Sequence, residues 1–357
     1  MQNSNLLKKA GIFDPYLDTL GGGERYGMTV AEALLKKGWR VDVFWPDEAL
    51  REKIKKKFSL DTDGVNYVPY SPRVNNLLNR WRRERNYNFL FYFSDGSIPF
   101  MFGKNNVLHF QVPFKKVLRK SLSNDLKLKT IKSIVCNSFF TKNVIDCGLK
   151  VDSRVIYPPV DIKSLKPLKK EDIIISVGRF SQLLQGKRQD VLVDAFKKFS
   201  GKAIGWKLIL AGGNEIGSED FLVSLKKKIE NFPIEVIENP QYESLVKLYG
   251  RAKIFWTASG YGIDEETDPE KVEHFGMTTV EAMSAGCVPI VLGKGGQKEI
   301  VEEGETGFLW ISEEELINKT FKVIKNPKMM SEISLKAQRK SRDFSKEKFY
   351  ENIYNLV

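Results

Sequence analysis

At 357 residues the chain is too long for one ordinary hydrophobic core, and its length fits two α/β domains of roughly 150 to 200 residues each. Its content of 42% hydrophobic and 29% charged residues is typical of a globular protein and excludes a disordered one. No N-terminal apolar stretch resembles a signal peptide, so we expect none. The longest apolar run, residues 89–102, is interrupted by Ser94 and Asp95 and is shorter than the roughly 20 apolar residues of a membrane span, so we expect no such span.

The cysteine and histidine content of the chain is low. Cys136, Cys147 and Cys287 are too few and too irregularly spaced for a disulfide framework or a zinc site. The two histidines, His109 and His274, exclude a His-rich metal centre. We therefore expect a cytoplasmic protein that needs no metal or other cofactor.

The formal net charge of +12 is unevenly distributed. Residues 1–160 hold 27 Lys and Arg against 15 Asp and Glu, whereas residues 161–357 hold 30 of each kind. The whole excess therefore lies in the first half, which predicts that this half meets an anionic partner.

Short apolar runs alternate with longer amphipathic stretches along the first half, which predicts a βα repeat. A glycine triplet at residues 21–23 precedes a helix that we expect to start at Glu24 and to stop at Gly38. The expected strands are residues 9–13, 39–45, 89–93, 106–110 and 133–137.

A Lys-rich, Pro-containing stretch through Lys170 follows the first series and is interpreted as an interdomain linker. We expect one domain over residues 1–165 and another over residues 166–357, with a last helix at about 343–357 that packs back on the first domain. The second series has almost continuously apolar strands, as in parallel sheets covered on both faces. Its expected strands are residues 172–177, 206–211, 234–237, 254–257 and 288–292.

The most informative stretch is residues 273–286, EHFGMTTVEAMSAG. Glu273 and Glu281 flank a loop that contains Gly276 and turns into a short helix. Amides at such a helix start can hold an anion or sugar hydroxyls, and a glycine lets a ligand approach the backbone. A structural alternative stays open, because Thr278 and Glu281 also fit a capping box, in which the glutamate only satisfies a backbone donor.

Further segments accompany this stretch in order along the chain: residues 21–24, 137–138, 157–161, 177–190, 295–301 and 304–309. Together with the Glu-x7-Glu pattern, these segments resemble the signature of retaining GT-B glycosyltransferases of family 4, the group 1 glycosyltransferases. The resemblance covers nearly the whole chain. It implies an α/β fold of two facing Rossmann-like domains, with a ligand cleft between them and the nucleotide-sugar donor site in the C-terminal domain.

The resemblance implies roles for several residues of the C-terminal half. Arg179 and Lys187 would grip the donor diphosphate, which a guanidinium fork and an ammonium together neutralise. Their separation of eight residues is longer than in the compact form of the motif.

The same resemblance places Glu273 by the donor sugar and Glu281 on the nucleotide ribose, because carboxylates accept hydrogen bonds from vicinal hydroxyls. The chain has His274 where the family more often has glycine. The backbone between these two glutamates would complete the donor site with the amides of Phe275, Gly276, Met277 and Thr278.

In the first half, Gly22 and Gly23 resemble the family's glycine-rich loop, which approaches the diphosphate and the acceptor. His109 resembles the family's cleft histidine near the donor sugar. A glycine triplet alone is more often a flexible turn, and a single histidine at a strand end is more often structural.

The resemblance implies transfer of a hexosyl group from a nucleotide-diphosphate sugar to an acceptor hydroxyl. No carboxylate stands out as an enzyme nucleophile, which favours the front-face mechanism proposed for the family, in which the departing diphosphate takes the acceptor's proton. The acidic Asp264-Glu265-Glu266 and Asp268 are interpreted as a charged surface loop in place of a metal site.

Basic residues in the first half interleave with apolar ones and indicate a surface for an anionic membrane, or else a solvated helix face. The first interpretation makes the protein peripheral on the cytoplasmic face of a membrane, with a lipid-linked saccharide or glycolipid as acceptor in cell-envelope glycan or glycoconjugate synthesis. The residues concerned are Lys53, Lys55, Lys56, Lys57, Leu77, Leu78, Arg80, Trp81, Arg82, Arg83 and Arg85.

Three other functions compete with this one. A basic nucleic-acid-binding protein would share the high pI, yet no nucleic-acid motif occurs and we expect no nucleic-acid partner. A dinucleotide oxidoreductase would need a complete Gly-x-Gly-x-x-Gly with a ribose-binding acid downstream, which is missing. A catalytically idle homologue that still binds nucleotide sugars is the third.

Overall fold

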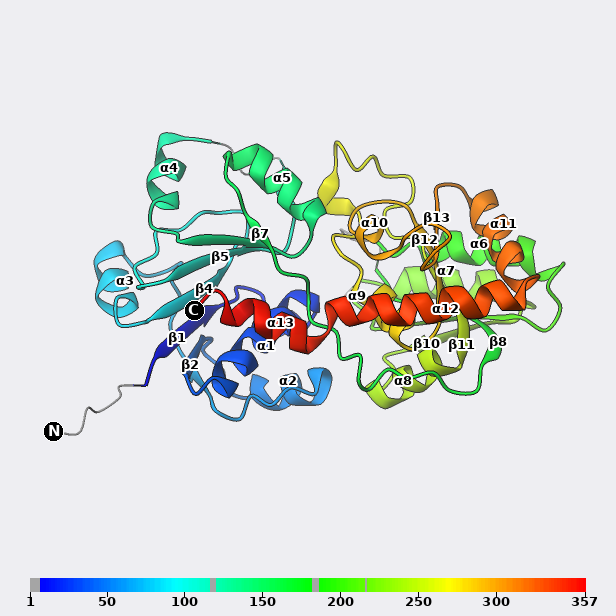
Figure 1. The fold of residues 1–357 in the computed structure, drawn as a ribbon, viewed down its shortest axis with the longest axis horizontal. Coiled ribbons are helices and arrows are strands. Elements are labelled where there is room, and N and C mark those ends of the chain that lie inside the picture. Colours follow the sequence, from blue (N-terminus) through cyan, green and yellow to red (C-terminus); the bar gives the residue numbers. More distant parts are fainter. Residues whose placement is uncertain (1–6, 116–119, 182–185, 216) are drawn as a thin grey trace. The chain divides into compact units, whose positions relative to one another are not determined.

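The computed structural model describes residues 7–115, 120–181, 186–215 and 217–357, and Figure 1 shows its ribbon. The chain divides into two compact units. One comprises the residues up to Pro159 together with Lys346–Val357, and the other comprises Val160–Ser345. The division falls six residues before the expected boundary. The reason is that residues 160–165 belong to the second unit, where the Ser284 hydroxyl donates to the carbonyls of Ile162 (3.2 Å) and Leu165 (3.0 Å).

The N-terminal unit contains a parallel sheet with the strand order β3-β2-β1-β4-β5-β6-β7. Its strands are β1 Lys9–Phe13, β2 Arg40–Phe44, β3 Val65–Val68, β4 Phe89–Phe93, β5 Asn106–Phe110, β6 Ser133–Cys136 and β7 Arg154–Val155. Its helices are α1 Gly22–Lys36, α2 Leu50–Phe58, α3 Leu77–Glu84, α4 Leu122–Leu128, α5 Phe139–Leu149 and α13 Lys346–Tyr354, with a 3-10 turn at Leu17–Thr19.

The last helix, α13, is part of the N-terminal core. Its Phe349 packs edge-on against Tyr26 of α1, with ring centroids 4.7 Å apart. The Lys346 ammonium lies 2.9 Å from the carboxylate of Glu32, whose side chain is 4% exposed. Apolar residues of α1, α2 and α13 cover one face of the sheet, and those of α5 help to cover the other.

The C-terminal unit has a second parallel sheet, with the order β10-β9-β8-β11-β12-β13. Its strands are β8 Glu171–Val177, β9 Lys207–Gly212, β10 Ile234–Glu238, β11 Ala252–Thr257, β12 Val288–Leu292 and β13 Phe308–Trp310. Its helices are α6 Gln189–Ser200, α7 Glu219–Ile229, α8 Tyr242–Arg251, α9 Met277–Ser284, α10 Gln297–Ile300, α11 Glu313–Ile324 and α12 Pro327–Ser341, with 3-10 turns at Pro269–Lys271 and Arg342–Phe344.

Both sheets confirm the predicted Rossmann-like architecture. In each sheet the order of strands reverses direction around the first strand, β1 or β8, and the carboxyl ends of neighbouring strands meet at one edge. Ligands of open α/β sheets bind at that edge. The segments that follow β1 and β5, and those that follow β8 and β9, are therefore the ones to inspect for function.

Candidate active site

Three of the predicted residues lie together at the carboxyl edge of the C-terminal sheet. The Lys187 ammonium lies 2.7 Å from Oε2 of Glu273, and Arg179 lies one residue beyond Gly178, just after β8. A Cβ on Gly178 would come within 2.7 Å of Cγ of Lys187, so this glycine makes room for the lysine stem. The separation of eight positions between Arg179 and Lys187 therefore does not keep Lys187 away from the site.

Glu273 is a paired, largely buried carboxylate. Burial raises its pKa, but the Lys187 ammonium, which both attracts it and donates a hydrogen bond to it, and the more distant charge of Arg179 outweigh this effect. The net result is a pKa below the usual range for a glutamate. Glu273 is consequently ionised at neutral pH and holds Lys187 in place.

Arg179 is more exposed, with 52% of its side chain accessible, and it forms an ion pair with Glu215, which follows β9. The Gln189 side chain donates to the carbonyl of Arg179 at 3.0 Å, which fixes the backbone from which the guanidinium extends. Each of the two predicted diphosphate-binding cations thus has one carboxylate partner. An entering anion would compete with those carboxylates for them.

Two glycines fix the backbone beside Glu273. The Gly296 amide donates to the carbonyl of Glu273 at 2.9 Å. A Cβ on Gly295 would lie 2.1 Å from that carbonyl oxygen, and a Cβ on Gly296 would lie 2.3 Å from the carbonyl oxygen of His274. No side chain fits at either position, so the contact requires glycine.

The acidic loop after β11 supports the same turn. Oε2 of Glu265 accepts a hydrogen bond from the Gly295 amide at 2.6 Å, and Oε1 lies 2.6 Å from the Lys298 ammonium. Glu265 therefore has a structural task. Among the described residues, no cluster of three or more His, Cys, Asp or Glu side chains is arranged to hold a metal ion.

The start of α9 differs from the capping-box alternative. Gly276, with φ of +116°, is the residue that precedes the helix, and the Thr279 amide is bonded to its carbonyl at 3.0 Å. Thr278 lies inside the first turn and does not cap it. Since the first amides of a helix have no intrahelical acceptor, those of Met277 and Thr278 can receive an anion or a sugar oxygen.

Glu281 has a different partner from the one that a capping box predicts. Its Oε2 accepts a hydrogen bond from the hydroxyl of the fully buried Tyr249 at 3.1 Å, and the residue is 8% exposed. Tyr249 belongs to α8, so Glu281 is oriented by a neighbouring helix.

The His274 side chain is held by the 3-10 turn that precedes the loop. Its Nε2 lies 3.1 Å from the carbonyl oxygen of Glu270, and the residue is 5% exposed. The difference from the family's usual glycine is thus accommodated at the back of the loop. Glu273 still points toward Lys187.

The edge formed by β9 and β10 is suited to backbone recognition. Asn239 has a left-handed backbone, with φ of +48°, and its amide donates to the Gly212 carbonyl at 2.7 Å. Its side-chain oxygen accepts from the Asn214 amide at 3.0 Å. This is where we expect a nucleotide base to be read.

In the N-terminal unit, the glycine triplet lies partly within a helix. Gly22 and Gly23 form the first turn of α1, which starts two residues earlier than expected because the Glu24 carboxylate accepts from the Gly21 amide at 2.5 Å. Gly23 lies against Gln111, since a Cβ there would be 3.5 Å from Cγ of that side chain. The flexible-turn alternative for the glycine triplet is therefore wrong, because Gly22 and Gly23 belong to a helix.

His109 is wholly buried in β5. Its ring stacks on Tyr26 with centroids 4.2 Å apart and meets Phe93 edge-on at 4.7 Å. Nε2 lies 2.9 Å from Oε1 of Gln111. Burial lowers the pKa of His109 to about 4, against smaller opposite effects of the Gln111 side chain and the Val135 backbone. The ring is therefore neutral, and in this arrangement Gln111 covers it.

A buried carboxyl follows β1 at the same edge. Asp14 is 3% exposed, its Oδ1 accepts from the Tyr16 amide at 3.0 Å, and Oδ2 has no partner among the described residues. Burial, and after it the charge of Glu24, raise the pKa of Asp14 to about 8. Asp14 is consequently protonated at neutral pH.

Sequence reasoning missed several residues that complete the two sites. They are Asp14, Gln111, Glu215, Tyr249 and Gln297, whose side-chain oxygen accepts from the Thr279 hydroxyl at 2.9 Å. Gln297 directly follows the glycine pair 295–296, so the motif segment 295–301 could have indicated it. Glu215 and Tyr249 had no local signal, because their partners are 36 and 32 positions away in the chain.

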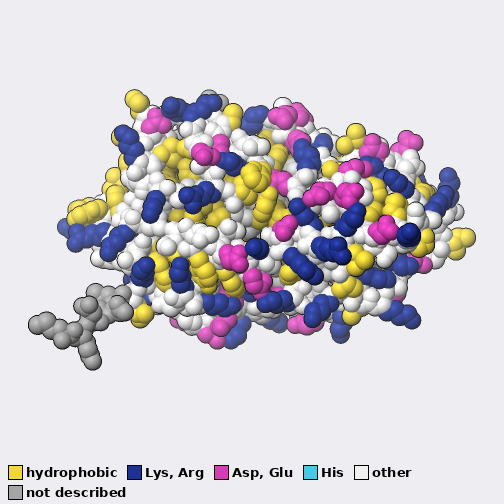
Figure 2. All heavy atoms as spheres, in the orientation of Figure 1, with side chains coloured by type: hydrophobic (Ala, Val, Ile, Leu, Met, Phe, Trp, Pro, Cys, Tyr) yellow, Lys and Arg dark blue, Asp and Glu magenta, His cyan; other side chains and the backbone are white. Residues whose placement is uncertain are grey.

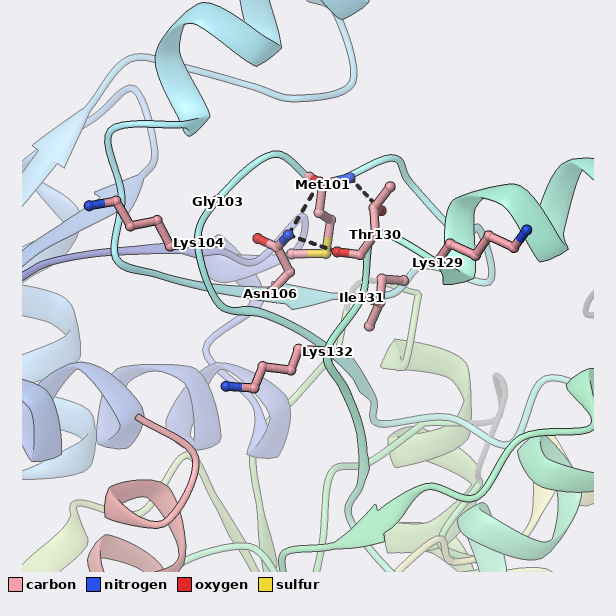
Figure 3. A pocket seen from close by; sticks show the side chains of 8 residues that line it. All are labelled: Met101, Gly103, Lys104, Asn106, Lys129, Thr130, Ile131 and Lys132. Atoms are coloured by element: carbon pink, nitrogen blue, oxygen red, sulfur yellow. Dashed lines mark hydrogen bonds between the residues drawn. The ribbon is translucent and has the colours of Figure 1, made fainter.

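A pocket of about 450 Å³ lies elsewhere in the N-terminal unit, at the amino ends of β5 and β6. Figure 3 shows its lining residues, with the Asn106 amide donating to the carbonyls of Met101 and Thr130. Lys104, Lys129 and Lys132 border this pocket, and their ammonium groups point in different directions. The pocket is thus at the opposite edge of the sheet from Asp14 and Gln111.

Comparison with known families matches both halves of the chain. Residues 159–340 match Glycosyl transferases group 1, and residues 20–164 match Glycosyltransferase Family 4.

A similar curated protein is the GDP-Man:Man(3)GlcNAc(2)-PP-Dol alpha-1,2-mannosyltransferase of Dictyostelium discoideum, 26% identical over 235 residues, which are 61% of this chain and 45% of that protein. The chain thus spans less than half of that relative. Among solved structures, a glycosyltransferase from Rickettsia africae has a TM-score of 0.74 at 19% identity, and Anabaena HepE in complex with UDP and glucose has 0.72 at 18%. In both cases 98% of each chain is covered, which shows the GT-B fold.

Proposed function

The chain belongs to the group 1 glycosyl transferases, and we propose that it transfers a hexosyl group from a nucleotide-diphosphate sugar to an acceptor hydroxyl with retention of anomeric configuration. The observation that carries this proposal is the cluster of Arg179, Lys187 and Glu273 beside the first amides of α9. Two cations and a helix N-terminus suit a doubly charged leaving group. The roles given to the individual residues are part of the proposal.

In the proposed reaction the bond between the anomeric carbon and the diphosphate oxygen breaks as the acceptor oxygen forms a bond on the same face. The acceptor's proton passes to the departing diphosphate oxygen. Arg179, Lys187 and the amides of Met277 and Thr278 stabilise the charge that develops on that oxygen. Glu281 holds the ribose, and the carboxylate of Glu273 both orients Lys187 and lies near the sugar.

We propose a metal-independent reaction, because the two cations and the amides already supply the positive field that a metal ion would add. Figure 1 shows α9 and the strands that place these groups within the C-terminal unit. In this proposal the N-terminal unit supplies the acceptor side, and Gly22, Gly23 and His109 keep the roles that the family resemblance implies.

The relatives guide the choice of substrates. The Dictyostelium protein carries GDP-Man and a PP-Dol oligosaccharide in its name, and HepE was solved with UDP and glucose. We therefore propose a lipid-linked saccharide as acceptor, and GDP-mannose as the first donor to test, with UDP-glucose as the second.

The anionic partner that the charge asymmetry predicts is, in this proposal, a membrane that carries the acceptor. The N-terminal unit holds 29 Lys and Arg against 17 acids, and the other unit holds 28 of each. Within the described residues no helix is both long and apolar enough to span a bilayer. Attachment would therefore be peripheral, on the cytoplasmic face.

The test is a transfer assay with purified protein, each donor in turn and a polyprenyl-diphosphate saccharide as acceptor. We expect one donor to give product, and NMR of the new linkage to show the donor's anomeric configuration. An inverted linkage would overturn the retaining mechanism. Nucleotide-sugar binding without turnover on any acceptor would support an idle homologue, and tight binding of random DNA that falls steeply with salt would favour the nucleic-acid alternative.

A further inference from the structure

Helix α3 has its polarity reversed. A surface helix normally buries its apolar stripe and exposes its charges. In α3 the buried residues are Arg80 and Glu84, whereas Leu77, Leu78 and Trp81 are 55%, 55% and 45% exposed. The apolar side chains therefore face outward.

The reversed orientation is fixed from inside. Nε of Arg80 lies 2.9 Å from Oε1 of Glu84, and the same carboxylate accepts from the Tyr70 hydroxyl at 2.8 Å and from the Phe102 amide at 3.2 Å. Rotating the helix to bury the leucines would leave this buried ion pair without its partners, which is strongly unfavourable. The exposed apolar face is thus a built feature of the fold.

Helix α4 adds to the same surface. None of its residues is buried, and Leu122 and Leu126 are 86% and 56% exposed. The segment 100–106 connects the two helices, because Arg80 bonds to the Phe100 carbonyl and the Met101 amide donates to Thr130 Oγ1, just after α4, at 3.1 Å.

Positive charge surrounds these apolar residues. Apart from the Arg80–Glu84 pair, segments 77–86, 101–104 and 120–132 hold eight Lys and Arg and one acid, Asp125. Three of these lysines border the pocket of Figure 3. Figure 2 shows hydrophobic and basic side chains together at the end of the N-terminal unit that carries α3.

We propose that α3 and α4 form a membrane-contact surface, in which the exposed Leu and Trp side chains enter the interfacial layer of a bilayer and the surrounding cations meet the phosphates of anionic phospholipids. Apolar anchors within a cationic ring are the combination that binds such bilayers. Helix α2 is not part of it, because α2 buries Leu50 and Ile54, exposes its lysines in the ordinary way and pairs Lys55 with Asp63 at 3.1 Å.

This inference deepens the proposed function and rests on it only for the idea that the acceptor resides in a membrane. The segment just before α3 lies near the carboxyl edge of the N-terminal sheet, which the proposal assigns to the acceptor. Arg73, four residues before α3, pairs with Asp95 after β4, and its guanidinium lies 5.8 Å from the Tyr16 ring centroid.

The test is co-sedimentation of the full chain with vesicles of phosphatidylcholine, with and without phosphatidylglycerol. The variant Leu77→Ser/Leu78→Ser/Trp81→Ser should bind the anionic vesicles about tenfold more weakly than the unchanged protein. The matched control Ile204→Ser/Val223→Ser/Leu335→Ser changes apolar residues that are 95%, 67% and 52% exposed in the other unit, and it should bind unchanged. Circular dichroism is the check that both variants are folded.

A second control, Lys53→Gln/Lys56→Gln/Lys57→Gln on α2, should bind almost as the unchanged protein does. Equal binding by the α3 variant, loss of binding in the α2 variant alone, or indifference of the unchanged protein to anionic vesicles would each overturn the proposal. A transfer assay with a water-soluble acceptor tests the proposed function separately from membrane binding. The α3 variant should keep transfer activity in this assay. If no donor gives product while the unchanged protein still binds vesicles, the proposed function is rejected but the membrane-contact surface is not.

Discussion

The ammonium of Lys187 lies 2.7 Å from the carboxylate of Glu273, although the two residues are 86 positions apart in the chain. Gly178 and the pair Gly295–Gly296 make this contact possible, the first by admitting the lysine stem and the others by holding the Glu273 backbone. The cation that we assign to the diphosphate is thus kept in place before any donor arrives. Such preorganisation is what makes fixed charges effective in a transition state.

Arg179→Ala should reduce turnover more than Glu281→Ala. Arg179 is assigned to charge that grows as the diphosphate departs, so its loss should lower kcat about 100-fold or more. Glu281 is assigned to a ribose that changes little, so its loss should mainly raise KM. Steady-state kinetics with the active donor measure both parameters. If Glu281→Ala abolishes turnover while nucleotide binding persists, the two roles are wrongly assigned.

The Lys187–Glu273 pair should make the stability of the fold depend on pH in the acidic range. The pKa of Glu273 in the folded chain is lowered, so the pair stabilises the fold above the unfolded-state pKa of a glutamate, and this contribution disappears as the pH falls through the folded-state pKa. Glu273→Gln should therefore lower the melting temperature at pH 7 and have little effect near pH 3. Melting curves of both proteins across this range provide the comparison. A difference that is constant with pH would mean that the charge of Glu273 is not responsible.

Gly296→Ala should destabilise the loop that carries Glu273. The added methyl would meet the carbonyl oxygen of His274 at 2.3 Å and Cα of Phe275 at 2.5 Å, both backbone atoms that cannot move freely. We expect a loss of about 1–3 kcal/mol and weaker donor binding. Gly201→Ala is the control, because nothing lies within 4 Å of a Cβ there. Thermal melts and nucleotide titrations should give the same melting temperature and nucleotide affinity for Gly201→Ala as for the unchanged protein.

The sheets could be predicted well from sequence, because buried parallel strands are continuous apolar runs. β1, β4, β5 and β12 lie at the expected residues. β3, β7 and β13 were not foreseen, since they are at most four residues long and β3 and β7 have exposed positions that interrupt the apolar pattern.

The site was only partly predictable. The motif residues were found by their resemblance to the family's motifs, and the structure brings Arg179, Lys187 and Glu273 together as a charge-based argument would require. The partner carboxylate Glu215 and the orienting Tyr249 depend on contacts between distant strands and helices, which spacing does not report. The start of α1 was misplaced because the Glu24 side chain caps the helix at the Gly21 amide, so the helix begins already at Gly22.

Activity should survive treatment with EDTA. We assign two side-chain cations and the α9 amides to the diphosphate, so in this proposal a hard cation is not needed for charge balance. The measurement is the rate of transfer before and after chelation, followed by addition of Mg²⁺ or Mn²⁺. Loss of activity that either ion restores would show that the proposed metal-independent reaction is wrong.

His109 should act as a neutral ring throughout the physiological pH range. Its pKa of about 4 is below the value of 6.5 for a free histidine, because the ring is buried between Tyr26 and Phe93. The unfolded chain therefore binds a proton at this residue more readily than the folded chain. Stability should fall as the pH drops from about 6.5 toward 4, by about 2 kcal/mol at pH 5.

Replacing the ring with one that does not titrate tests this directly. His109→Phe keeps the aromatic stack but loses the contact with Gln111, so it should be less stable than the unchanged protein at pH 7 and lose less stability on going to pH 5. Thermal melts at the two pH values give the difference, and Cys147→Ser, at an exposed cysteine, is the control for handling. If His109 titrated in the folded protein, the rate of transfer would show an inflection near pH 6.5 that is absent in His109→Phe. We expect no such inflection in the unchanged protein. Such an inflection, or an equal loss of stability in both proteins, would mean that the ring takes up its proton in the folded state, and that solvent or substrate reaches it past Gln111.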